Sequence, residues 1–186
     1  MRLFVSVDLP EDRSPGIAAV QEELRGVPGF ALTDPEQAHV TLKFLGEVPG
    51  DETGVVEDAV GEAVEDADVA PFEAKIGGIG VFPSRQYIRV VWIGIERGER
   101  AMARLHEAIE DRTTGLGFDS HGHAFTPHVT IARMNHAGSA EAVRQVLRER
   151  EPDVGVMRVD AVHLMESDLG SGSPEYSTVA RVPLTE

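Results

Sequence analysis

One of the clearest strand patterns in the chain is Ala38-His39-Val40-Thr41-Leu42-Lys43-Phe44-Leu45-Gly46, and the prediction of the fold starts from it. From His39 to Phe44, polar and apolar residues alternate. This period of two is typical of a strand that buries one of its faces. We therefore predict that Val40, Leu42 and Phe44 face a core, while His39 and Thr41 share the opposite face.

The same pattern returns in the second half of the chain, at Pro127-His128-Val129-Thr130-Ile131-Ala132-Arg133. Here His128 and Thr130 are expected to share the face of the strand that lies opposite the core. Two matching His-x-Thr strands in one chain suggest two halves of a single site. A single copy would be weak evidence, because a histidine on a strand is more often a structural residue.

The remaining elements follow from apolar periodicity and from turn residues. We expect helices at residues 14–25, 51–67, 98–114 and 139–150. Besides the two histidine strands, we expect strands at residues 2–9, 30–33, 72–81, 86–96, 154–167 and 176–184. In each half, the histidine strand is followed by a helix, which is the outline of an imperfect duplication.

Long strands joined by short turns favour an α+β fold with antiparallel sheets. We predict a bilobal duplicated fold, in which two mainly antiparallel sheets face a central cleft and the helices cover the outer faces. Residues 1–186 would then form a single domain of two pseudo-repeated lobes. One lobe would carry His39 and Thr41, and the other His128 and Thr130.

Two opposed histidines permit paired proton transfer. The unperturbed pKa of imidazole, about 6.5, allows one ring to act as a base and the other as an acid near neutral pH. Two threonine hydroxyls between them can hold the oxygens of a tetrahedral anion. These residues favour phosphoryl chemistry without a metal or another cofactor. The pair His121 and His123 has a spacing that suits a metal, but no third ligand is evident nearby.

The chain resembles the 2H phosphoesterase superfamily, which is defined by two His-x-Thr motifs. More narrowly, it resembles the RNA 2′,3′-cyclic phosphodiesterases, also called 2′-5′ RNA ligase-like proteins. Supporting matches are Leu3-Phe4-Val5-Ser6-Val7, Gly80-Val81-Phe82-Pro83 and the tail from Glu166-Ser167 to Pro174-Glu175-Tyr176. The resemblance implies metal-independent opening of a 2′,3′-cyclic phosphate at an RNA end to a 2′-phosphate. It also implies a weak reverse activity that joins RNA ends through a 2′-5′ bond.

The resemblance also implies roles for individual residues. His39 and His128 become the acid–base pair, and Thr41 and Thr130 become the phosphate-binding hydroxyls. Positions five after each histidine are associated with stacking on a base and with contacting phosphate; here they are Phe44 and Arg133. Strict alternation points both away from the motif histidines, and a β-bulge would be needed to bring them back. The alternatives are a core aromatic for Phe44 and a surface ion pair for Arg133.

The other charged and aromatic residues are weaker candidates. Lys43, Arg85 and Tyr176 are candidates for lining the cleft, and two of them would add positive charge there. His106, His136 and His163 are expected to be structural or exposed.

The amino-acid composition indicates in which cellular compartment the protein works and whether it associates with membranes. The chain has no cysteine, so it has neither disulfides nor thiolate metal sites, which fits a cytoplasmic protein. No apolar run approaches the ~18–20 residues that span a bilayer. We expect a monomer that does not bind membranes.

The net charge of −15 comes from 32 Asp and Glu residues against 17 Lys and Arg residues. Such a charge argues against a broad nucleic-acid-binding face. It favours a halophilic adaptation of the surface to a salty cytoplasm, with a basic partner as the alternative explanation.

Two other functions stay open at this point. The same chemistry suits a small cyclic nucleotide or ADP-ribose 1″,2″-cyclic phosphate, and the acidic surface mildly favours such small substrates. A protein that only binds RNA ends is the other alternative, although a pure binder would not need two opposed imidazoles.

Overall fold

The computed structural model describes residues 1–134, 140–170 and 172–186. The strands in these ranges are β1 (Arg2–Asp8), β2 (Phe30–Leu32), β3 (His39–Glu47), β4 (Phe72–Pro83), β5 (Ile88–Arg97), β6 (His128–Met134), β7 (Asp153–Val159), β8 (Ala161–Asp168) and β9 (Glu175–Pro183). The α-helices there are α1 (Ser14–Glu22), α2 (Thr53–Ala67), α3 (Glu99–Gly115) and α4 (Ala140–Glu149). Short 3₁₀ turns occupy Glu11–Arg13, Pro35–Gln37 and Gly50–Glu52. None of these helices combines the length and the apolar character needed to cross a bilayer.

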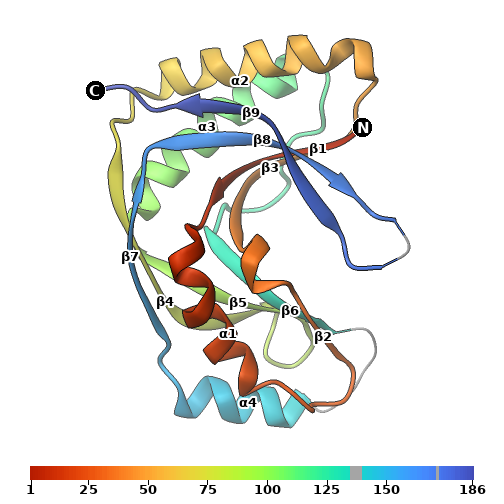
Figure 1. The fold of residues 1–186 in the computed structure, drawn as a ribbon, viewed down its shortest axis with the longest axis vertical. Coiled ribbons are helices and arrows are strands. Elements are labelled where there is room, and N and C mark those ends of the chain that lie inside the picture. The colour runs from red at the N-terminus through yellow and green to blue at the C-terminus, as the bar shows by residue number, and fades with distance from the viewer. Residues whose placement is uncertain (135–139, 171) are drawn as a thin grey trace.

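The prediction of an α+β fold with antiparallel strands is confirmed, but the prediction of two separate sheets is wrong. The strands form one sheet in the order β7-β4-β5-β6-β3-β1-β8-β9, and β2 pairs with β6 (Figure 1). Its two halves meet where β3 and β6 pair, and the only residues in register there are Val40 and Val129. The sheet stays continuous because this contact joins the two histidine strands directly.

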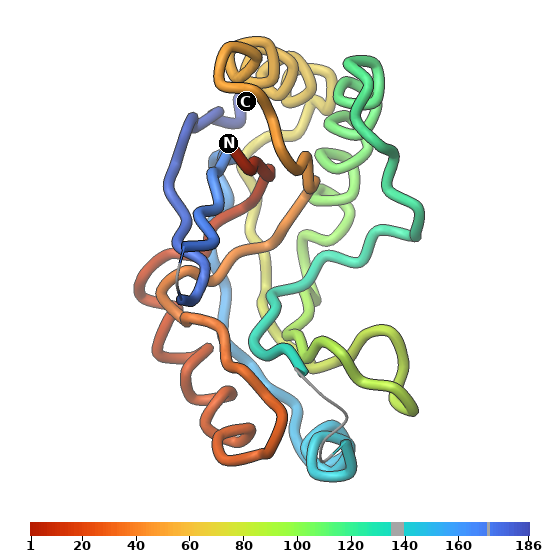
Figure 2. The backbone as a smooth tube through the Cα atoms, turned by 90° about the vertical axis from the view of Figure 1, so that its right-hand side faces the viewer, coloured from red at the N-terminus to blue at the C-terminus, as the bar shows by residue number. Residues whose placement is uncertain are grey.

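The helices that follow β1 and β5 each cross to the other half of the sheet. Helix α1 follows β1 but packs against β6 and β7, whereas α3 follows β5 and packs against β3 as well as β5. Helix α2 lies on α3 and also contacts β8 and β9. Figures 1 and 2 show the result, with α1 and α4 beside one half of the fold and α2 and α3 beside the other. Each half of the chain therefore helps to build the surroundings of the other half's histidine strand.

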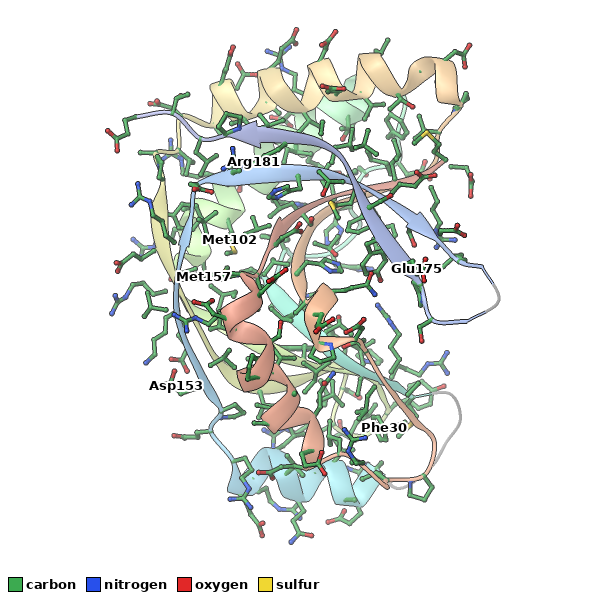
Figure 3. All side chains as sticks on the ribbon, viewed as in Figure 1. Phe30, Met102, Asp153, Met157, Glu175 and Arg181 are labelled. Carbon is green, nitrogen blue, oxygen red and sulfur yellow. The ribbon has the colours of Figure 1, made fainter. Side chains whose placement is uncertain are left out.

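The core lies between these helices and the sheet. Val40 and Val129 are completely buried, as are Ile17 of α1 and Met102 of α3. Figure 3 labels Met102 and also Met157 of β7, which is 3% exposed. The alternation read from the sequence therefore identifies the buried face of both histidine strands at their beginnings.

One predicted strand is two strands in the structure. Residues 154–167 were expected to form a single element, but the chain breaks at Asp160 between β7 and β8. Strand β7 pairs with β4, and β8 pairs with β1, so this segment passes from one half of the sheet to the other. Asp160 makes an ion pair with Arg181 at 3.1 Å, and its carbonyl accepts a hydrogen bond from the Leu184 N–H at 2.8 Å. Period-two patterning continues through such a crossing, so the sequence alone does not reveal it.

Candidate active site

The two His-x-Thr motifs cross at the junction of the two halves of the sheet. Val40 lies opposite Val129 in an antiparallel pair. His39 therefore lies beside the position of Thr130, and Thr41 beside that of His128, on the face opposite the buried valines. All four side chains line one pocket of about 370 Å³. Strand pairing thus brings together two motifs from opposite halves of the chain.

Each motif strand carries a β-bulge directly after its threonine. In the pairing of β1 with β3, Val5 faces Lys43 and Ser6 faces Thr41, so Leu42 is an extra residue. In the pairing of β5 with β6, Val91 faces Ala132 and Trp92 faces Thr130, so Ile131 is an extra residue. An extra residue reverses the alternation of the side chains that follow it, and in β3 this reversal lasts until the next register shift, at Leu45.

The bulges bring Phe44 and Arg133 onto the pocket side, against the expectation from strict alternation. Both side chains line the same pocket as the histidines and threonines. Phe44 is 56% exposed, so it is not a core aromatic. The reversal also turns Lys43 away from the pocket and into the protein interior. There Lys43 is only 4% exposed and pairs with Glu110 at 2.8 Å.

Arg85 is exposed and is not among the described residues that line the pocket, whereas Tyr176 does line it. Of the three weaker candidates for the cleft, the structure therefore places only Tyr176 there.

Both motif histidines have the same tautomer, which follows from their hydrogen bonds. His39 Nδ1 lies 2.9 Å from the carbonyl oxygen of Gln37, and His128 Nδ1 lies 2.7 Å from that of Thr126. A carbonyl only accepts, so Nδ1 carries the proton in both rings and Nε2 is the basic nitrogen. The Thr41 hydroxyl then donates to His39 Nε2 at 3.1 Å. The two rings are oriented alike, each by the residue two positions before it.

Aromatic rings surround each histidine. Phe4 and Tyr176 both lie 5.1 Å from the His39 ring, between centroids. Phe82 lies 4.9 Å from the His128 ring and Trp92 lies 5.9 Å from it. This burial lowers the pKa of both His39 and His128 below the ordinary value, since it disfavours the charged ring.

The charge of Arg133 acts on both histidines. Besides burial, its guanidinium lowers the pKa of His39 and of His128, whereas the carboxylate of Asp8 raises that of His39. Among the described residues that line the pocket, Arg133 is the only Lys or Arg. The described lining of the pocket therefore combines one permanent positive charge, Arg133, with the two imidazoles and the carboxylate of Asp34.

The other histidines lie elsewhere. His106 is 7% exposed and stacks on Phe125 with ring centroids 4.2 Å apart, while His121 lies 5.2 Å from His106 and 5.7 Å from His123. Within the described ranges, no group of three or more His, Cys, Asp or Glu side chains is arranged to hold a metal ion. His163 lies 3.7 Å from Asp8, and His136 is outside the described residues.

Several residues near the site carried no predicted role. Phe4, Phe82 and Trp92 contact the histidines, and Gln37 joins the pocket to the β8–β9 loop by donating to the Pro174 carbonyl at 3.0 Å. Gln37 also accepts from the Tyr176 N–H at 2.8 Å. Phe4 and Phe82 belong to segments that carried the family resemblance, which was the one available signal. Trp92 and Gln37 gave no signal in the sequence.

Comparison with known proteins assigns the family. A model of the 2′-5′ RNA ligase superfamily matches residues 10–171, which is most of the chain. The chain belongs to this superfamily.

Curated and solved relatives cover nearly the same length. An RNA 2′,3′-cyclic phosphodiesterase of Archaeoglobus fulgidus is 34% identical over 179 residues, covering 95% of this chain and 96% of that protein. The protein of the same name from Methanothermobacter thermautotrophicus is 31% identical, with 95% of each chain covered. The crystal structure of TT0787 from Thermus thermophilus superposes with a TM-score of 0.81 at 29% identity, covering 99% of this chain and 98% of that one.

Proposed function

We propose that this protein hydrolyses 2′,3′-cyclic phosphates at RNA ends to 2′-phosphates, by acid–base catalysis between His39 and His128 and without a metal. The observation that carries the proposal is the pair of imidazoles that line one pocket with both Nδ1 atoms held by backbone carbonyls. The names of the relatives, which are similar over almost the whole chain, support RNA as the substrate.

The reaction needs one proton acceptor and one proton donor on opposite sides of phosphorus. The neutral imidazole takes a proton from water at its Nε2, and the water oxygen bonds to phosphorus. The bond from phosphorus to O3′ breaks, and the protonated imidazole delivers its Nε2 proton to O3′. The bond to O2′ stays, so the products are a 2′-phosphate and a free 3′-hydroxyl. Either histidine can take either role in this scheme.

The other pocket residues suit the remaining parts of the substrate. We propose that Thr130 donates to a phosphoryl oxygen, that the Thr41 hydroxyl turns from His39 Nε2 to donate to another when substrate binds, and that the Arg133 guanidinium balances their charge. Phe44 stacks on Phe4 with centroids 5.7 Å apart and leaves half of its surface free, which suits stacking with a base. A volume of about 370 Å³ fits a terminal nucleotide, within the range of small-molecule sites.

Product analysis tests this function. An oligonucleotide that ends in a 2′,3′-cyclic phosphate should be converted to the 2′-phosphate, and turnover should persist in excess EDTA. Small cyclic nucleotides and ADP-ribose 1″,2″-cyclic phosphate are assayed in parallel, since preference for one of them would change the substrate. A 3′-phosphate product would contradict the assigned leaving group. Loss of turnover on chelation, restored by a divalent ion, would overturn the two-histidine mechanism.

The pKa values predict an acidic optimum. Burial lowers the pKa of both His39 and His128 from 6.5, so both rings are mostly neutral at high pH and the acid is missing. Protonation of one ring as the pH falls supplies the acid, and protonation of both removes the base. The pH profile of kcat/KM should therefore be bell-shaped with its maximum below 6.5. A maximum above neutral pH would contradict this ordering.

The net charge of −15 predicts tolerance of salt. We propose that the protein works as a monomer in a salt-rich cytoplasm, where screening shortens the Debye length from about 10 Å at 0.1 M to about 3 Å at 1 M. Self-repulsion and repulsion of the substrate both weaken under these conditions. The thermal midpoint should rise from low salt to molar KCl, and kcat/KM on a short substrate should be kept or raised. Greatest stability at low salt, with activity that falls steeply as salt is added, would favour a basic partner instead.

A further inference from the structure

The carbonyls of the extra residues Leu42 and Ile131 each accept a hydrogen bond from a buried side chain, and the Ile131 carbonyl also accepts one from the Thr33 N–H. An extra residue has no partner in the ladder, so its buried carbonyl needs a donor from elsewhere. The Leu42 carbonyl accepts from His106 Nδ1 at 2.7 Å, and the Ile131 carbonyl accepts from Gln21 Nε2 at 3.0 Å. The two donors are 7% and 3% exposed, respectively. Leu42 and Ile131 hold equivalent positions, three residues after His39 and His128.

The two donors come from the helices that cross between the halves of the sheet. Gln21 lies on α1 and reaches β6, 110 positions later in the chain. His106 lies on α3 and reaches back to β3, over 64 positions. Figure 1 shows α1 and α3 beside opposite halves of the fold. Each half of the chain thus supports the bulge that redirects the other half's pocket residue.

Both donors are themselves held in place. The His106 ring stacks on Phe125 at an angle of 6°, which directs Nδ1 towards Leu42. Gln21 Nε2 also lies 2.7 Å from the Thr33 carbonyl, and the Thr33 hydroxyl donates to the Thr130 carbonyl at 3.0 Å. The Thr33 N–H is a second donor to Ile131, at 3.0 Å.

We propose that His106 and Gln21 are positioning residues, which hold the two bulges and thereby keep Phe44 and Arg133 in the pocket. Neither donor is among the described residues that line the pocket, so both act through the strand. Without the side-chain hydrogen bond, the bulge becomes less stable relative to a regular strand. In a regular strand, alternation would turn Phe44 or Arg133 to the opposite face. The expected defect is in substrate binding and alignment. Loss of the His106 donor should affect only the contact made by Phe44, and loss of the Gln21 donor only the contact made by Arg133.

Paired substitutions separate the hydrogen bond from packing. His106→Leu and His106→Asn have nearly the same shape, but only asparagine keeps a donor at the place of Nδ1. Gln21→Met keeps the length of the side chain and removes its donor. We expect His106→Leu and Gln21→Met each to raise KM by about 10-fold, up to the ~10²-fold that a misplacement of about 1 Å can cost. His106→Asn should stay within a few-fold of the unchanged protein.

Double-mutant cycles then identify the residue through which each donor acts. The effect of Gln21→Met should vanish in an Arg133→Met background and persist in a Phe44→Ala background. The effect of His106→Leu should vanish with Phe44→Ala and persist with Arg133→Met. Additivity in all four combinations, or a lower thermal midpoint with unchanged KM, would overturn the proposal and leave both residues purely structural.

Binding is measured as well as turnover, because the KM readout rests on the proposed function. Trp92 is the single tryptophan of the chain, and its ring lies 5.9 Å from His128, so its fluorescence can report adenosine 2′-monophosphate. If the unchanged protein binds this probe but does not turn over a cyclic phosphate, the proposed enzymatic function is refuted. The double-mutant cycles then use the Kd of the probe in place of KM, so the roles of His106 and Gln21 are still tested.

Poor folding of a variant does not remove the test. If Gln21→Met does not fold, the His106 pair decides by itself. If His106→Leu does not fold either, His106→Ala is compared with His106→Asn: weaker binding in the alanine variant alone supports the donor role, and equal binding in the two variants contradicts it.

Discussion

Replacement of His39 or His128 by alanine should lower kcat by about 10²–10⁴-fold in each case, the usual contribution of a general acid or base. Each ring lines the pocket, and its Nε2 is the basic nitrogen because Nδ1 donates to a backbone carbonyl. The double variant should lose less than the product of the two single losses, since the residues act as a unit. Steady-state kinetics on a cyclic-phosphate oligonucleotide measures these ratios.

The exposed His123 provides the matched control, because His123→Ala makes the same change outside the pocket and should leave kcat unchanged. The pH profiles of the single variants also assign the roles. Loss of the base removes the low-pH limb of the bell, and loss of the acid removes the high-pH limb. Near-normal turnover in either single variant would show that the histidine concerned takes no part in proton transfer.

The second large effect concerns stability rather than chemistry. Lys43→Met should lower the free energy of unfolding by about 3 kcal/mol, the lower end of the range for breaking one partner of a buried ion pair. The Lys43 side chain is 2% exposed and donates to Glu110 at 2.8 Å and also to the Asp119 carbonyl. Glu110 keeps 18% exposure, so it is not left wholly without solvent. Chemical denaturation at neutral pH measures the loss.

Lys75→Met is the control, because Lys43 and Lys75 are the two lysines of the chain. Lys75 pairs with Glu96 at 3.3 Å, and both side chains are partly exposed, at 35% and 47%. Its loss should cost about 1 kcal/mol or less. Equal losses in the two variants would contradict the distinction between a buried and an exposed pair. A large loss of kcat in folded Lys43→Met would instead support the expectation from the sequence that Lys43 adds positive charge to the cleft.

Much of the fold follows from patterns that are local in the sequence. Apolar residues at helical spacing predicted the four helices to within three residues at each end. Alternation predicted both histidine strands and their buried valines. The break at Asp160 was missed, since a strand that changes partners keeps the same alternation on both sides. The join between the two halves was missed as well, because pairing between β3 and β6 involves residues far apart in the chain.

The pairing of side chains at the beginning of each motif follows from the amino-acid pattern alone. His39 and Thr41, like His128 and Thr130, share a face because side chains two positions apart on a strand always do. Repetition of the motif in the two halves was enough to predict one shared site. These conclusions use only the alternation within each strand and the repetition of the motif in the sequence.

The orientation of the side chains after Leu42 and Ile131 depends on contacts with distant parts of the fold. Alternation predicts Lys43 on the pocket face and Phe44 and Arg133 away from it, and the extra residues Leu42 and Ile131 reverse all three. A bulge forms where the partner strand and a buried donor accommodate it, and the donors here are 64 and 110 positions away. The alternation of side chains is a property of the strand, whereas its interruption depends on what the rest of the fold brings to the carbonyl.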